Sequence, residues 1–177
     1  MDISKFDNTL DNARFLTKVD NIFIMLYSGV MKKNLDTAKH KISDEIYNKY
    51  NNYVEELKKD GLIQMYGELN VKSTTIEDIY ETEDKIIVKV ELISRFLNYF
   101  LDEETLEYVR GNKDRREEHI NKLTLEKIKN SKELGAARHC PSCGAHMNLS
   151  RSGKCTYCGA IFNLEEYDYI LTDIVVY

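Results

Sequence analysis

The chain has 177 residues, of which 42% are hydrophobic and 31% charged, a composition typical of a globular protein with one packed core and a small appendage. The net charge is −5, and no stretch approaches the roughly 18 apolar residues that a membrane-spanning helix needs. The first residues lack the basic start and the apolar segment of a secretion signal, which favours a cytoplasmic protein.

The first third of the chain has helical periodicity. Residues 8–33 predict one long helix, because its apolar residues recur three and four positions apart: Leu16, Val19, Phe23, Leu26 and Val30. Residues 38–42 predict a short second helix. Ser43 is a typical N-cap, followed by acidic residues, and predicts a third helix that runs to about residue 59. The pair at 60–61, Asp-Gly, ends it.

From residue 62 the pattern changes to that of strands. Residues 62–80 are rich in strand formers, and residues 85–101 alternate, with one parity apolar: Ile86, Val88, Val90, Leu92, Phe96 and Phe100. A straight strand of that length would extend about 50 Å, which a small domain cannot cover. We therefore expect a bend near Ser94 and Arg95. Residues 111–114 predict a turn before a last strand at about 117–129.

Helices followed by strands with short connections predict an α+β fold, in which the N-terminal helices pack on a curved antiparallel sheet. Three segments follow from this interpretation. Residues 1–130 form the helix-plus-sheet domain, and residues 131–138 form a polar linker. Residues 139–177 form a small zinc ribbon with a C-terminal strand or tail.

The four cysteines of the chain stand in two matched pairs, each with two intervening residues and a following glycine: Cys140 and Cys143, Cys155 and Cys158. Such turns direct two sulfur atoms at one point, and two of them facing each other supply the closed tetrahedral site that structural zinc prefers. We therefore predict one structural Zn²⁺. Buried free thiols, disulfides or a redox role are the alternatives, and His139 or His146 could compete as ligands.

The charge around the cysteines argues against nucleic acid as the partner. Residues 131–162 contain four basic residues and one acidic residue, and four thiolates with one Zn²⁺ would leave this segment near +1. Nucleic-acid binding depends on dense positive charge. The sequence therefore carries no strong nucleic-acid signal, and a nucleic-acid-binding zinc ribbon remains an alternative.

The order of several segments resembles a known family. A long helix ends in a charged break over 23–36, a third helix opens over 42–47, and an alternating strand covers 86–97. The cysteine knuckles at 140–145 and 153–159 close the order. Residues 10–130 resemble the Tim forty-four-like family, named after a subunit of the mitochondrial inner-membrane protein translocase, and the whole resembles its bacterial relatives with a C-terminal zinc ribbon.

This resemblance implies a cone-shaped fold like that of nuclear transport factor two, in which a curved sheet and helices enclose an apolar pocket. It also implies a binding or tethering role, because the mitochondrial member links an import channel to a chaperone motor at the membrane. The expected partners are therefore a protein and an apolar small molecule or lipid. The expected location is cytoplasmic, with peripheral contact to a membrane surface.

For the pocket we select Phe23, Tyr50, Tyr53 and His119 as candidate ligand-binding residues. The tyrosines combine an apolar ring with a polar tip, and the alternative is that they only cap the core at its rim. No residue is assigned a catalytic role, and we expect a non-enzymatic adaptor. The alternative is a small pocket enzyme of the same fold that uses His119 with a nearby carboxylate.

The C-terminal residues are apolar. Alternation over 167–171 predicts a strand that pairs with the ribbon, and residues 174–177 would form an exposed patch if nothing covered them. These last residues therefore dock either on their own domain or on a partner.

Overall fold

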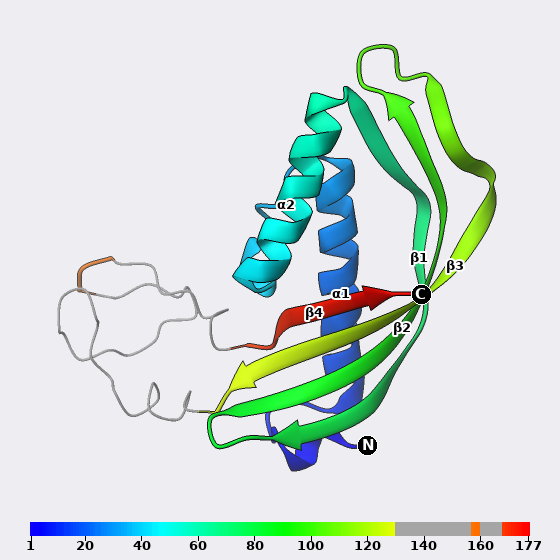
Figure 1. The fold of residues 1–177 in the computed structure, drawn as a ribbon. Coiled ribbons are helices and arrows are strands. Elements are labelled where there is room, and N and C mark those ends of the chain that lie inside the picture. Colours follow the sequence, from blue (N-terminus) through cyan, green and yellow to red (C-terminus); the bar gives the residue numbers. More distant parts are fainter. Residues whose placement is uncertain (130–156, 160–167) are drawn as a thin grey trace.

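The computed structural model describes residues 1–129, 157–159 and 168–177. Its elements in chain order are η1 (Ile3–Lys5), α1 (Asn12–Met31), η2 (Lys39–Lys41), α2 (Asp44–Lys59), β1 (Leu62–Glu81), β2 (Lys85–Asp102), β3 (Tyr108–Ile128) and β4 (Ile170–Val176). The strands form one antiparallel sheet in which each lies beside its neighbour in sequence. The sheet is strongly curved and both helices lie on its inner side, which confirms the predicted α+β class (Figure 1).

Local signals in the sequence explain where both helices begin and end. The Asp11 side chain accepts a hydrogen bond from the Arg14 backbone N–H at 2.8 Å and begins α1. Ser43 does the same for Ile46 at the start of α2, as predicted. Gly61 follows α2 with φ +66°, a conformation that only glycine adopts without strain, so the helix ends there.

The long strands bend where their pairing is interrupted. The β1–β2 register shifts between Gly67 and Asn70, and the β2–β3 register shifts between Phe96 and Asn98. Bulges of this kind increase the local twist. A bend was predicted at Ser94 and Arg95, and the β2–β3 irregularity begins at Phe96.

The predicted turn at residues 111–114 is wrong, because these residues lie inside β3. Gly111 has φ +103°, and a Cβ at its position would lie 2.5 Å from the Asn98 carbonyl oxygen. The glycine therefore lets β3 approach β2 closely and continue past the irregularity. A glycine that ends a strand and one that permits close backbone approach look alike in sequence.

One core lies between the helices and the inner face of the sheet. Its largest fully buried side chains come from both helical and strand segments: Ile3, Phe15, Val19, Phe23, Leu26, Val30, Val54, Val88, Leu92, Leu125, Tyr169 and Leu171. The inward parity of β2 was predicted from alternation, and its Ile86, Val88, Val90, Leu92 and Phe96 are buried.

The C-terminal strand completes the main sheet, so its predicted pairing with the ribbon is wrong. β4 pairs with residues 121–126 of β3, and Ser43 donates its backbone N–H to the Leu171 carbonyl at 2.8 Å. Leu171 and Ile174 are buried, and their burial explains the preference for the domain core. The predicted linker at 131–138 lies outside the described residues, as does the predicted ribbon except for residues 157–159 and its C-terminal part.

The two residues just before β4, Asp168 and Tyr169, contact side chains of the N-terminal segments. Asp168 accepts a hydrogen bond from Lys18 Nζ at 2.5 Å, and Lys41 Nζ lies 3.7 Å away. The Tyr169 ring meets the Phe15 ring edge to face at 5.0 Å. Burial alone would raise the pKa of the Asp168 carboxyl, but the hydrogen bonds from Lys18 and the Tyr169 backbone N–H, together with the charges of Lys18 and Lys41, outweigh it and hold that pKa below its usual range.

Candidate ligand-binding face

The inner face of the sheet changes chemistry along β2. Val88, Val90 and Leu92 are fully buried, whereas the inward positions beyond the bend include Asn98 and Phe100, both only partly buried. We call this second region, with the side chains that reach it from α1, α2, β1 and β3, the aromatic–amide face. Its members are Phe23, Tyr27, Tyr50, Tyr53, Gln64, Tyr66, Phe96, Asn98, Glu117 and His119.

A continuous row of rings crosses this face from α1 to β3. Ring centroids are separated by 4.2 Å between Phe23 and Tyr27, and by 4.6 Å between Tyr27 and Tyr66. The row continues from Tyr66 to Phe96 at 5.1 Å, and from Phe96 to His119 at 4.7 Å with the last two rings stacked. Offset and edge-to-face contacts at these spacings are favourable, and they fix the ring planes.

A second row, made of polar groups, crosses the same face. The Tyr53 hydroxyl donates to Gln64 Oε1 at 2.7 Å, and Gln64 Nε2 donates to Asn98 Oδ1 at 2.8 Å. Asn98 Nδ2 donates to Glu117 Oε2 at 3.2 Å, and the same carboxylate oxygen lies 3.4 Å from His119 Nε2. Each group orients the next, so the amides and the carboxylate hold one arrangement.

The tyrosine hydroxyls on this face stay protonated at neutral pH. Burial raises the pKa of Tyr50 to about 12, although a hydrogen bond with Tyr27 lowers it slightly. Burial likewise raises the pKa values of Tyr27 and Tyr66 above the usual range. These hydroxyls therefore act as neutral hydrogen-bonding groups and do not supply a base.

The structure brings together all four residues that were selected for a pocket. Phe23 is fully buried at one end of the ring row, and the His119 side chain, 23% exposed, lies at the other. Tyr50 and Tyr53 reach the face from α2 and are partly buried. Their role in holding a ligand remains a prediction.

Gln64 and Asn98 were missed by the sequence interpretation, whereas Glu117 is one of the carboxylates near His119 that the enzyme alternative invoked. A signal for the first two was present, because each is a polar residue at an inward position between apolar neighbours of the same parity. Glu117 has the same parity on β3 as the inward-facing His119 and Asn121, and it pairs with the inward-facing Phe96. Simple alternation along β3 therefore brings it to the face.

The predicted zinc ligands fall almost entirely outside the described part of the chain. Of the four, only Cys158 is described, and it is exposed. Within the described residues, no group of three or more His, Cys, Asp or Glu side chains could hold a metal ion. The zinc site at Cys140, Cys143, Cys155 and Cys158 therefore stays a prediction.

Comparison with known proteins decides the family. The model of the Tim44-like domain matches residues 1–135, which is more than half of the chain. The chain belongs to the Tim44-like domain family. A search of curated proteins found no match for this Tim44-like chain. In the part of the chain that the structure describes, no helix is long and apolar enough to cross a membrane.

Among solved structures, the Tim44-like chain is similar to the intermembrane space region of the chloroplast protein ARC6. The sequences are 7% identical, and the alignment covers 91% of this chain and 95% of the other with a TM-score of 0.42.

Proposed function

We propose that this Tim44-like protein is a non-enzymatic binding or adaptor module that holds an apolar ligand or peptide on its aromatic–amide face and contacts a protein partner or a membrane surface. Membership of the family supports a binding role. The observation that carries the proposal is the pair of rows on this face, one of rings and one of amides.

The two rows suit a ligand with apolar side chains and a polar backbone. The partly exposed rings on this face, such as those of Tyr66 and His119, supply apolar contact, whose burial stabilises a complex by about 25 cal/mol for each Å² removed from water. Asn98 and Glu117 are partly exposed, and each side chain can make hydrogen bonds beyond those already described. An extended peptide presents complementary N–H and C=O groups at regular intervals.

A titration of the full chain with the apolar dye 1-anilinonaphthalene-8-sulfonate tests the face. Tyr66→Ala removes a partly buried ring from the row and should weaken dye binding about fivefold or more. Tyr80→Ala is the matched control, because it removes the same side chain from the outer face of the same strand, where it is 39% exposed. Equal binding by both variants, at temperatures where both are folded, would contradict the proposal.

The contact between Glu117 and His119 favours a second candidate, a small pocket enzyme. A carboxylate 3.4 Å from an imidazole nitrogen can orient that imidazole as a base. Against this candidate, His119 Nε2 is buried and the ring stacks on Phe96. Turnover of a panel of activated esters that is lost in His119→Ala would support catalysis, and turnover unchanged by the substitution would remove it.

We further propose that Cys140, Cys143, Cys155 and Cys158 form a structural zinc ribbon, inserted in the sequence between β3 and β4. The matched spacing supports this proposal, and Glu126 and Ile170, near the two ends of the insertion, are paired in the sheet. Elemental analysis of the natively purified chain should find about one zinc per chain, and Cys143→Ser should lose it. Absence of metal, or disulfides between these cysteines, would contradict the ribbon.

Peripheral membrane contact from the cytoplasm is proposed on the family resemblance alone. Flotation with vesicles of neutral and anionic lipids tests it, because a bound protein rises with the vesicles. A salt-dependent oligonucleotide titration tests the nucleic-acid alternative, and no binding at low salt removes that alternative.

A further inference from the structure

A trough lies on the outer face of the sheet, opposite the aromatic–amide face, and Glu117 is the one member of that face that also lines the trough. Arg95 precedes the inward-facing Phe96 by one residue, so its side chain points outward. On one side of β2, β1 places Glu68 and Leu69 between its paired residues Gly67 and Asn70, and Glu68 has φ +55°. On the other side, β3 accommodates residues 113–116 between its paired Asn112 and Glu117.

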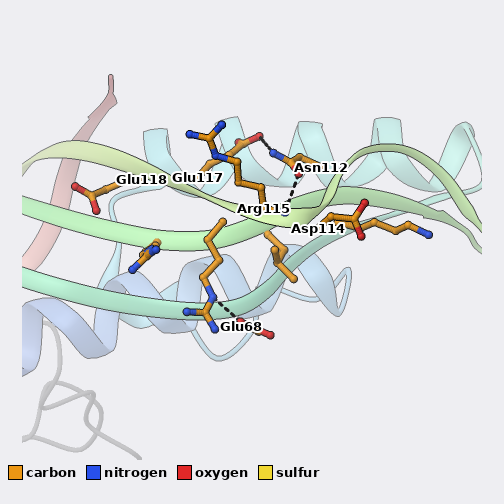
Figure 2. A pocket seen from close by; sticks show the side chains of 10 residues that line it. Glu68, Asn112, Asp114, Arg115, Glu117 and Glu118 are labelled. Carbon is orange, nitrogen blue, oxygen red and sulfur yellow. Dashed lines mark hydrogen bonds and ion pairs between the residues drawn. The ribbon is translucent and has the colours of Figure 1, made fainter.

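The two irregularities flank the same short stretch of β2 and hollow the surface there. One cavity of about 1020 Å³ and a second of about 570 Å³ share Glu68, Arg95 and Arg116 in their linings. Figure 2 shows Glu68 of β1 on one side of the larger cavity, with Asn112, Asp114 and Arg115 of β3 across from it. Bulges are common beside functional sites because they redirect side chains in this way.

Most charges in the trough are already paired. Arg116 forms an ion pair with Glu68, and Lys72 Nζ lies 2.9 Å from Glu118. Lys113 Nζ lies 4.7 Å from the centre of the Tyr108 ring, a cation–π contact.

Two guanidinium groups are left over. Among the described residues, the side chains of Arg95 and Arg115 have no ion-pair or hydrogen-bond partner, and Asp114 is the single unpaired acid in the lining of the larger cavity. The Arg115 backbone N–H is held by Asn112 Oδ1 at 3.0 Å, which fixes the position of this residue in the irregular segment. The trough therefore presents two unpaired guanidinium groups and one unpaired carboxylate.

We propose that this trough binds an acidic segment of a partner protein, with Arg95 and Arg115 each holding a carboxylate. The guanidinium group matches a carboxylate with two parallel N–H···O bonds. A polyphosphate backbone is more densely charged than a peptide segment with spaced carboxylates, and it fits less well because acidic residues separate the basic ones. The larger cavity is lined by four acidic and four basic residues: Glu68, Asp114, Glu117, Glu118, and Arg95, Lys113, Arg115, Arg116.

Fluorescence anisotropy of the full chain with a labelled peptide of alternating glutamate and glycine, at low NaCl, tests this site. The glutamine version of the peptide is the neutral reference. The protein should bind the glutamate peptide about fivefold or more tightly than the glutamine peptide, and Arg95→Gln with Arg115→Gln should remove that preference. Both arginines are exposed, so the variant should unfold at the wild-type temperature.

A matched control removes two positive charges elsewhere. Lys5 and Lys59 are exposed and do not line the trough, so Lys5→Gln with Lys59→Gln should bind the glutamate peptide like the wild type. Equal losses in both double variants, a preference below about fivefold, or tighter binding of an oligonucleotide of equal charge would overturn the proposal. Tyr66→Ala lies on the opposite face and should leave this binding unchanged, so the two proposals fail independently.

Discussion

Inward and outward side chains alternate in both halves of the curved sheet, but the inward side chains of the two halves differ in burial and chemistry. We call residues 73–81, 85–94, 119–128 and β4 the closed half, and residues 62–71, 96–102 and 108–117 the open half. The closed half contributes fully buried side chains to the core that it shares with α1 and Tyr169: Val88, Val90, Leu92 and Leu125. In the open half, rings alternate with amides, of which Asn98 is partly exposed and Gln64 is buried.

The elements that pack on the sheet, rather than the strand pattern, determine whether an inward residue lies in the core or on the partly exposed face. Where apolar side chains cover the sheet, inward residues form dry core. In the open half the tyrosines of α2 reach the sheet instead, and the Tyr53 hydroxyl satisfies the buried Gln64. The buried Gln64 is tolerated there because its amide oxygen and its amide nitrogen both have partners.

The largest expected effect separates the halves directly. Leu92→Ala, in the closed half, should lower the free energy of unfolding by about 4 kcal/mol, because it removes a fully buried side chain and leaves a cavity. Leu97→Ala is the matched control on the outer side of the same strand, where the leucine is half-buried, and should cost about 1 kcal/mol. Urea denaturation measures both, and equal losses would contradict the division.

A buried ion pair should give the next largest effect. Lys127 Nζ lies 2.6 Å from Asp7 Oδ2, and the Asp7 side chain is 5% exposed. Asp7→Asn should lower the free energy of unfolding by about 2 kcal/mol at neutral pH, because Lys127 loses its charged partner. Asp36→Asn, at an exposed position, should have little effect and serves as the control.

The Asp7 effect should depend on pH. Burial alone would raise the pKa of the Asp7 carboxyl, but hydrogen bonds from Lys127 and Thr9 outweigh it and hold that pKa below its usual range. The contribution is therefore fully present above the unfolded pKa of about 3.9 and is lost as the pH falls through the lower folded pKa. Denaturation curves of wild type and Asp7→Asn should converge below about pH 4. A difference that stays constant at pH values well below 4 would contradict the assignment.

The polar row of the open half should contribute less. Tyr53→Phe removes the hydroxyl that donates to Gln64 and should cost about 1 kcal/mol, because the amide oxygen loses its partner. Tyr47→Phe, on the same helix, is the control. Thermal unfolding measures the difference. Equal unfolding midpoints for the two variants would show that the hydrogen bond between Tyr53 and Gln64 does not stabilise the fold.

The smallest effect is expected from the exposed rim of the trough. Lys72 and Glu118 are about half exposed and 2.9 Å apart, so Lys72→Gln should change the free energy of unfolding by less than about 0.5 kcal/mol. A larger loss, persistent at high salt, would show that the outer face also stabilises the bend.

Much of the fold could be predicted from local patterns. The periodicity of residues 8–33 and the Ser43 N-cap placed both long helices correctly, and alternation in β2 identified its inward residues. The role of Gly111 inside β3 could not be predicted, because its close approach to Asn98 depends on a contact between two strands. The sequence identified four residues of the candidate face: Phe23, Tyr50, Tyr53 and His119. It did not identify Gln64 and Asn98, whose hydrogen bonds depend on the pairing of β1 with β2.

The sequence by itself determined the helices, the strand parity and the paired spacing of the cysteines, because each depends on residues a few positions apart. Only the tertiary structure decided that β4 joins β3, that Asn98 reaches Glu117, and that Arg95 lies unpaired between two irregular segments. These outcomes depend on which strands become neighbours and on where their registers shift. Such choices are set by burial and pairing over the whole sheet.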